Sequence, residues 1–163
     1  LGAVQKVLQN LLRERVSIRD LQTILETLAD YAPAVKDTDL LTEYVRMSLS
    51  RHISKAHQSN DSVIHAVTLN QEIEETIAKS VHETAQGAFL SIEPGMAQKI
   101  LGRIKEGLEE AMSRGHQPVL LASNQTRRFV RKLTERAFPG IPVISHGEIS
   151  NTVKVQTLKV VRL

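Results

Sequence analysis

The chain has 163 residues, of which 41% are hydrophobic and 24% are charged, and it contains no cysteine. These values are typical of an ordinary folded protein with one good core or two small ones, and they exclude a disulfide scaffold and a thiolate zinc site. The formal net charge of +3 is basic, but it falls short of the charge density of a dedicated nucleic-acid binder.

No run of residues approaches the ~18 consecutive apolar positions that a membrane-spanning helix needs. The N-terminus lacks the pattern of a signal peptide. The chain begins at Leu1 rather than at a methionine, and it enters a helical pattern almost at once. We therefore expect a piece of a longer protein.

Residues 1–58 predict three amphipathic helices. Apolar residues of the first helix follow the i, i+3, i+4, i+7, i+8 spacing of one face, namely Val4, Val7, Leu8, Leu11 and Leu12. For the second helix, Ser17 offers an N-cap hydroxyl with Asp20 three residues on, and Pro33 ends it. Asp37 is the expected cap of a third helix, whose apolar side reaches Ile53.

Residues 59–163 predict alternating strands and helices. Pro94 suits the first position of a helix, and Gly87 and Gly115 are expected to end helices. The continuous apolar run Pro118–Ala122 predicts a strand covered on both faces. Gly102 and Gly107 lie inside one predicted helix, and we attribute both to close helix packing. The predicted elements are strand 62–69, helix 70–87, strand 88–92, helix 94–115, strand 118–122, a helix capped by Ser123 or Asn124, strand 141–145 and a last strand from Val153.

This order of elements predicts an α+β or α/β fold. We expect a three-helix, winged-helix-like lobe over residues 1–58, followed by a small α/β lobe over residues 59–163 with a central sheet packed by helices. The polar turn 58–62 separates the lobes and is too short to be a flexible linker.

The sequence offers no motif for catalysis. No GxGxxG or GxxxxGK[ST] loop is present, and the histidines show no HExxH pattern or i, i+4 pair. A Ser-His-Asp triad needs only to meet in space, so a hydrolase stays open as an alternative, although no nucleophile elbow supports it. We predict no catalytic, cofactor-binding or metal-binding residue and no cofactor, and we expect that the protein is not an enzyme.

One helix carries a cluster of basic residues. Arg127, Arg128, Arg131, Lys132 and Arg136 form a stripe away from the apolar positions of the predicted helix. The stripe is either a contact for an acidic partner or nucleic acid, or a solvated helix face. The candidates for partner contact are the polar positions that we expect to be exposed, namely Arg46, Arg51, Arg128, Arg131 and Lys132.

A winged-helix nucleic-acid-binding module is the alternative from another functional class. Three helices followed by a strand fit it, and the third helix would enter a major groove. Asp37, Asp39 and Glu43 on that helix would repel phosphates, and no aromatic residue interleaves the basic stripe for base stacking. We therefore predict no nucleic-acid partner.

Several segments together resemble one known family. The dense matches are Leu11-Leu12, Val16–Leu21, Ile24–Ala32 and Leu41–Arg46, and weaker matches follow at Pro118–Leu121 and Ile141–Ser145. These segments resemble the C-terminal cytoplasmic region of the FlhA/LcrD (FHIPEP) family, the export-gate component of bacterial flagellar and virulence type III secretion systems. Residues 17–33 look more like the flagellar branch, and the tail 157–163 has no clear counterpart.

The resemblance implies a docking platform rather than a catalyst. Family members form a ring below the membrane and bind export substrates, their chaperones and components of the export ATPase complex. The implied partners are these proteins and other copies of the chain, on the cytoplasmic face of the inner membrane. The implied membrane contact is only through an N-terminal transmembrane region that this sequence lacks. Docking would involve lobe movement between open and closed arrangements. The family's chaperone-binding depression lies mainly in preceding subdomains, so none of its residues is carried over.

Overall fold

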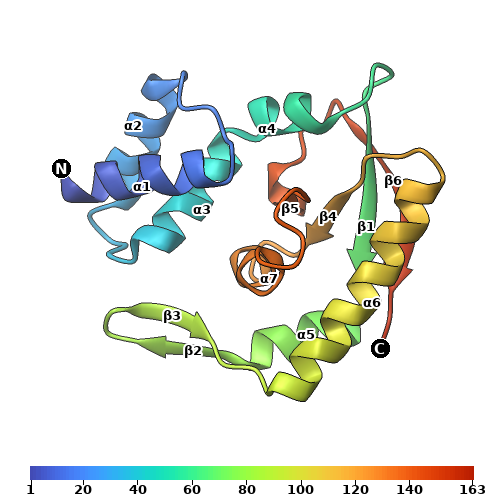
Figure 1. Cartoon of the computed structure of the whole chain (residues 1–163). Helices are drawn as coiled ribbons and strands as arrows, with labels where there is room; N and C mark the ends of the chain where they lie inside the picture. The colour runs from blue at the N-terminus through green and yellow to red at the C-terminus, as the bar shows by residue number, and fades with distance from the viewer.

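A four-stranded parallel sheet lies at the centre of the structure, a computed structural model that describes all 163 residues (Figure 1). Its strands are β1 (Val63–Leu69), β4 (Val119–Ala122), β5 (Val143–Ser145) and β6 (Lys154–Val161), in the spatial order β5-β4-β1-β6. All three strand pairs are parallel. Each β4 residue is buried, which confirms the predicted strand with both faces covered.

Four helices precede the sheet: α1 (Gly2–Arg13), α2 (Leu21–Tyr31), α3 (Thr38–Ser48) and α4 (Ser50–His57). Asp37 caps α3 as predicted, but α2 is capped by Asp20 rather than Ser17. The prediction of one continuous third helix that reaches Ile53 is wrong, because the helix breaks at Leu49. The Ser48 hydroxyl donates to the Tyr44 carbonyl one turn back and accepts from Thr27, a side-chain pattern that bends helices.

The helix predicted over residues 70–87 is also wrong. Helix α5 (Gln71–Lys79) is followed by a hairpin of β2 (Val81–Thr84) and β3 (Gly87–Leu90), which stands apart from the central sheet. Gly87 lies in the hairpin turn at φ +131°, where its carbonyl accepts a hydrogen bond from the Thr84 hydroxyl. Figure 1 shows the hairpin reaching beneath the N-terminal helices.

Two further helices cover the sheet, α6 (Pro94–Ser113) and α7 (Arg127–Thr134), and a 3₁₀ turn, η1 (His146–Glu148), follows β5. Pro94 opens α6 and Gly115 ends it at φ +85°, as predicted. Helix α7 begins later than its predicted cap. Ser123 instead closes the preceding turn, where its side chain accepts from the Thr126 amide and donates to Glu74.

The core consists of two layers, one on each face of the sheet. One layer joins α1–α4 to Ile64, Ala66, Val119, Leu121 and Ile144. The other joins α5, α6 and α7 to Val67, Leu69, Leu120, Ala122, Val143 and Val161. The N-terminal helices therefore share their core with the sheet, and the division at residues 58/59 stays a prediction.

Gly107 confirms the close-packing interpretation, because a Cβ there would lie 3.0 Å from Val161 Cγ2 and 3.3 Å from Val67 Cγ1. Gly102 contradicts it. A Cβ there would meet no atom within 4 Å, since Gly102 lies on the solvent side of α6.

Candidate protein-interaction site

A buried arginine joins the N-terminal helices to the sheet. Arg127, the first residue of α7, is 1% exposed. Its guanidinium donates to Glu43 at 2.7 and 2.8 Å, to Glu14 at 2.8 and 3.0 Å, and to the Val143 carbonyl at 2.9 Å. Both carboxylates are bound in the bidentate geometry that suits guanidinium. The end of α1, the middle of α3 and the start of α7 are thereby held together.

Arg46 was predicted to be an exposed contact residue, and that prediction is wrong. Its side chain is 3% exposed and donates to Glu148 at 3.0 and 2.8 Å. Its Nη1 lies 3.8 Å from a Glu14 oxygen and has no hydrogen-bond partner. Three arginines (Arg46, Arg127 and Arg131) thus oppose three glutamates (Glu14, Glu43 and Glu148), and we call these six residues the central ion network.

The network fixes the charge state of Glu14 and Arg127. Burial alone raises the pKa of Glu14, but the hydrogen bonds and charge of Arg127, with the charges of Arg46 and Arg131, outweigh burial and hold that pKa below its usual value. Burial alone lowers the pKa of Arg127, and the charge and hydrogen bonds of Glu43 and Glu14 raise it well above its usual value. Both groups are therefore ionised at neutral pH.

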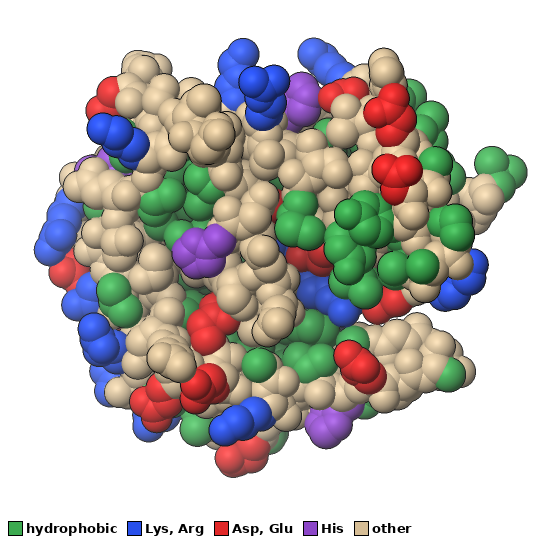
Figure 2. All heavy atoms as spheres, turned by 180° about the vertical axis from the view of Figure 1, so that it is seen from behind, with side chains coloured by type: hydrophobic (Ala, Val, Ile, Leu, Met, Phe, Trp, Pro, Cys, Tyr) green, Lys and Arg blue, Asp and Glu red, His purple; other side chains and the backbone are tan.

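Helix α7 lines a groove of about 330 Å³, which is also lined by strand β3 and by residues of α1 and α3, and we call it the α7 groove. Arg128 binds Asp37 at 3.1 Å and lies 4.7 Å from the Phe129 ring centroid, a cation–π arrangement. Phe89 of the hairpin is 50% exposed at this groove. Figure 2, a view from behind, shows basic and hydrophobic side chains in the hollow between the helices and the hairpin.

The structure brings together three of the five predicted contact residues. Arg128, Arg131 and Lys132 line the α7 groove, and Lys132 is the most open, with a 72% exposed side chain 3.9 Å from Glu135. Arg128 and Arg131 were predicted to be exposed, but their side chains are only 18% and 15% exposed, because they lie 3.1 Å from Asp37 and 3.7 Å from Glu14. Arg51 is exposed on α4 and does not line this groove. Their roles in partner contact stay predictions.

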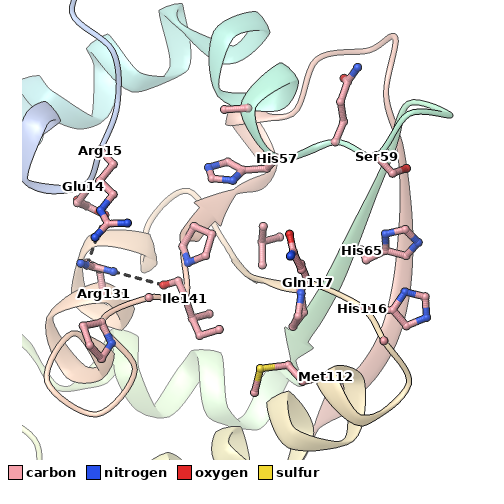
Figure 3. Close-up of a pocket in the computed structure, with 18 of the residues that line it drawn as sticks. Glu14, Arg15, His57, Ser59, His65, Met112, His116, Gln117, Arg131 and Ile141 are labelled. Atoms are coloured by element: carbon pink, nitrogen blue, oxygen red, sulfur yellow. Dashed lines mark hydrogen bonds and ion pairs between the residues drawn. The ribbon is translucent and has the colours of Figure 1, made fainter.

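A larger pocket of about 820 Å³ lies where β1 and β4 begin and beside the loop that leads into β5. Its charged and titratable lining residues are Arg13, Glu14, Arg15, His57, His65, His116 and Arg131. We call it the strand-start pocket. Figure 3 shows Arg15, Glu14 and Arg131 on one wall and His65 and His116 on the other.

Sequence reasoning missed the glutamates of the central ion network and placed Arg127 with the exposed basic stripe. A signal was present in α3, where Glu43 and Arg46 stand three residues apart and flank the buried Val45. Charged residues at the border of an apolar stripe indicate a paired, buried cluster. Their partners could not be found, because Glu14 and Glu43 lie 113 and 84 positions from Arg127.

Residues 1–154 match the model of the FHIPEP family, and the chain belongs to that family. It is 41% identical over 160 residues to the flagellar biosynthesis protein FlhA of Bacillus subtilis. It is 34% identical over 158 residues to the low calcium response locus protein D of Yersinia pestis. These alignments cover 98% and 97% of this chain but only 24% and 22% of the relatives. The chain thus spans about a quarter of their length.

Solved structures share the fold. The CdsV protein of Chlamydia pneumoniae superposes with a TM-score of 0.91 at 38% identity, over 98% of this chain and 46% of that one. The nonameric SctV-C of EPEC gives a TM-score of 0.85 at 35% identity, over 95% of this chain and 46% of that one. The structure of a complex of CdsV with CdsO also matches, with a TM-score of 0.89. The expected fold class and family are therefore confirmed.

The nucleic-acid alternative gains no support from these relatives, which are proteins of type III export gates. The structure also argues against it, because the side of α3 that carries Glu43 and Arg46 is buried. A helix in that position cannot present this side to a DNA groove. No helix in the chain has the length and apolar character needed to cross a membrane.

Proposed function

We propose that this chain is a non-enzymatic part of a bacterial flagellar type III protein export gate. It forms part of a homo-oligomeric ring on the cytoplasmic face of the inner membrane. The ring docks export substrates, their chaperones and components of the export ATPase complex. The observation that carries the proposal is the likeness to the nonameric SctV-C over 95% of this chain.

The paired state of the buried charges supports a structural rather than a catalytic role. The carboxylates of the central ion network are held by arginines at 2.7–3.0 Å. The Glu14 carboxylate in particular is a poor general base, because its pairing with arginines holds its pKa below the usual value. The network instead stiffens the platform on which partners dock.

Exposed apolar side chains on α1 and α2 support self-association. Leu12, Leu21 and Leu25 are 54%, 45% and 47% exposed, and a monomer would leave this apolar surface in water. We propose that these residues contribute to contact between copies. The lobe movement implied by the family resemblance would have to leave intact the core that α1–α4 share with the sheet.

Sedimentation tests ring formation directly. The chain would be compared with a longer protein that includes the rest of its cytoplasmic region. We expect self-association of the longer protein, and weaker association when Leu25→Lys is introduced. Val155→Lys is the matched control, because Val155 is 39% exposed on the sheet edge, away from α2. A strict monomer in both preparations, together with salt-sensitive duplex binding, would overturn the proposal.

The flagellar assignment rests on the 41% identity to FlhA of Bacillus subtilis alone, because FlhA of Borreliella burgdorferi is 35% identical, within the 34–38% of the virulence proteins InvA, MxiA and the low calcium response protein. A chimeric FlhA of Bacillus subtilis would carry this chain in place of its matching segment. We expect motile cells from this chimera and not from one carrying the matching Yersinia segment. Equal motility of the two chimeras, or loss of motility in both despite normal protein levels, would contradict the flagellar assignment.

A further inference from the structure

The strand-start pocket carries an excess of positive charge. Arg13, Arg15 and Arg131 line it, and Glu14 is its one acidic lining residue. The Glu14 carboxylate is already bound by Arg127 at 2.8 and 3.0 Å on its inner side. Arg13 and Arg15 are exposed and form no ion pair, so no carboxylate of the chain compensates their charges, and we call these two residues the mouth of the pocket.

The backbone holds Arg15 in place at this mouth. Arg15 adopts a left-handed conformation, with φ of 60°, directly after α1. Its amide donates to the Leu12 carbonyl at 2.9 Å, and the Val16 amide donates to Leu11 at 2.9 Å. These bonds satisfy the last carbonyls of the helix in the manner of a C-terminal cap, where glycine is the usual residue. An arginine here carries a conformational cost that a glycine would avoid.

The opposite wall of the pocket is lined by histidines. The rings of His65 and His116 lie 4.6 Å apart, and His57 enters the pocket from α4. Figure 3 shows Arg15 and Arg131 on one wall and this histidine pair on the facing wall, with the pocket between them. A single small anion in 820 Å³ cannot contact both walls, whereas a segment with several carboxylates can.

The neutral lining residues favour a peptide. Gln58 and Gln117 line the pocket with side-chain amides, and each amide can both donate to and accept from a peptide backbone. An inorganic anion would use only the donors.

We propose that the strand-start pocket binds an acidic peptide segment of a protein partner. Carboxylates of the segment pair with Arg13 and Arg15 at the mouth, and further acidic residues lie toward His65 and His116. Gln58 and Gln117 bind the backbone of the segment. Met112, which is 46% exposed and also lines the pocket, contacts the segment through its side chain.

Fluorescence anisotropy tests the proposal on the full chain. The probe is a labelled decapeptide with glutamate at alternating positions, and its control has glutamine at those positions. We expect binding of the acidic peptide at low salt that weakens as the salt concentration rises. Absence of binding by the acidic peptide at low salt, or equal binding of both peptides, would overturn the proposal.

A matched pair of variants tests whether the peptide binds in the strand-start pocket. Met112→Glu brings a carboxylate into the pocket, whereas Ser113→Glu makes the same charge change one position along α6, at an exposed residue outside the lining. We expect Met112→Glu to weaken the binding on the order of ten-fold and Ser113→Glu to leave it nearly unchanged. Equal effects would mean that binding follows net charge alone and would refute the site.

A second pair tests the mouth. Arg15→Asn removes the charge with a residue that tolerates a positive φ, and Arg19→Asn does the same in the same loop but outside the lining. We expect weaker peptide binding only for Arg15→Asn. Thermal unfolding monitored by circular dichroism would confirm that all four variants are folded.

Competition distinguishes the class of ligand. Inorganic phosphate that displaces the labelled peptide as effectively as unlabelled peptide would make this a small-anion site and overturn the peptide assignment. A single-stranded oligonucleotide that binds more tightly than the peptide would also overturn it. The ring proposal is tested separately by sedimentation, so failure of either proposal leaves the other standing.

Discussion

Replacing Arg127 by methionine should be among the most damaging single changes to stability. Methionine keeps much of the aliphatic length but leaves the Glu43 and Glu14 carboxylates without their bidentate partner. The central ion network then has two arginines and three glutamates, which leaves one net negative charge in a site where Arg127 itself is 1% exposed. Removing one partner of a buried ion pair typically costs about 3–5 kcal/mol.

The loss can be measured by urea unfolding followed by circular dichroism, with the free energy taken from linear extrapolation. For a chain of this size, about 3–5 kcal/mol corresponds to a fall in Tm of roughly 6–20 °C. Lys132→Met is the control on the same helix, because Lys132 is 72% exposed and its ion pair is 3.9 Å long. We expect that control to change the free energy of unfolding by less than about 1 kcal/mol.

A double variant separates charge from packing. If the damage comes from the unpaired carboxylate, Arg127→Met combined with Glu43→Gln should recover part of the lost free energy, because glutamine removes the buried charge. The damage of Arg127→Met alone should also shrink toward acid pH, where protonation neutralises the abandoned carboxylates. A free energy of unfolding for Arg127→Met no lower than that of Lys132→Met would refute the argument from the central ion network.

Three further predictions concern local features. Gly102→Ala should stabilise α6 by up to about 1 kcal/mol. Gly107→Ala should have a free energy of unfolding roughly 1–3 kcal/mol lower than that of Gly102→Ala in chemical denaturation, because its methyl group would press on Val161 and Val67. Equal stability of the two variants would contradict the packing. Asn70→Ala should cost about 1 kcal/mol, because the Asn70 side chain accepts from the Ile73 amide at 3.1 Å, whereas Asn60→Ala in the exposed turn should cost little; a smaller loss for Asn70→Ala than for Asn60→Ala would count against the cap. Burial, followed by the charge of Arg46, lowers the pKa of His57 from 6.5, despite the opposing charge of Glu148. Just below pH 6.5 the unfolded chain therefore binds more protons than the folded chain, and the free energy of unfolding should fall as the pH drops through this range. The fall between pH 7.5 and 5.5 should be smaller in His57→Gln, and an unchanged fall would show that His57 does not contribute.

The sequence by itself determined the features that depend on neighbouring residues. Pro94 and Gly115 mark the ends of α6, and Asp37 caps α3, because these residue types act on the backbone within one turn. The apolar run at β4 predicted a doubly covered strand, since a strand has only two faces to bury. The resemblance of several segments to the FlhA/LcrD family was likewise readable from the residues alone.

Only the tertiary structure decided the features that depend on residues distant in sequence. Strand β3 confirms the strand predicted over residues 88–92, but β2 forms where the end of a helix was predicted, because Val81 pairs with Leu90 across a turn that Gly87 permits. The sequence pattern predicted that Arg46 and Arg127 face solvent. Both are buried, because they pair with Glu148 and Glu43, which lie 102 and 84 positions away in the sequence. A helical pattern gives the direction of a side chain, and the partner that it meets depends on how the whole chain packs.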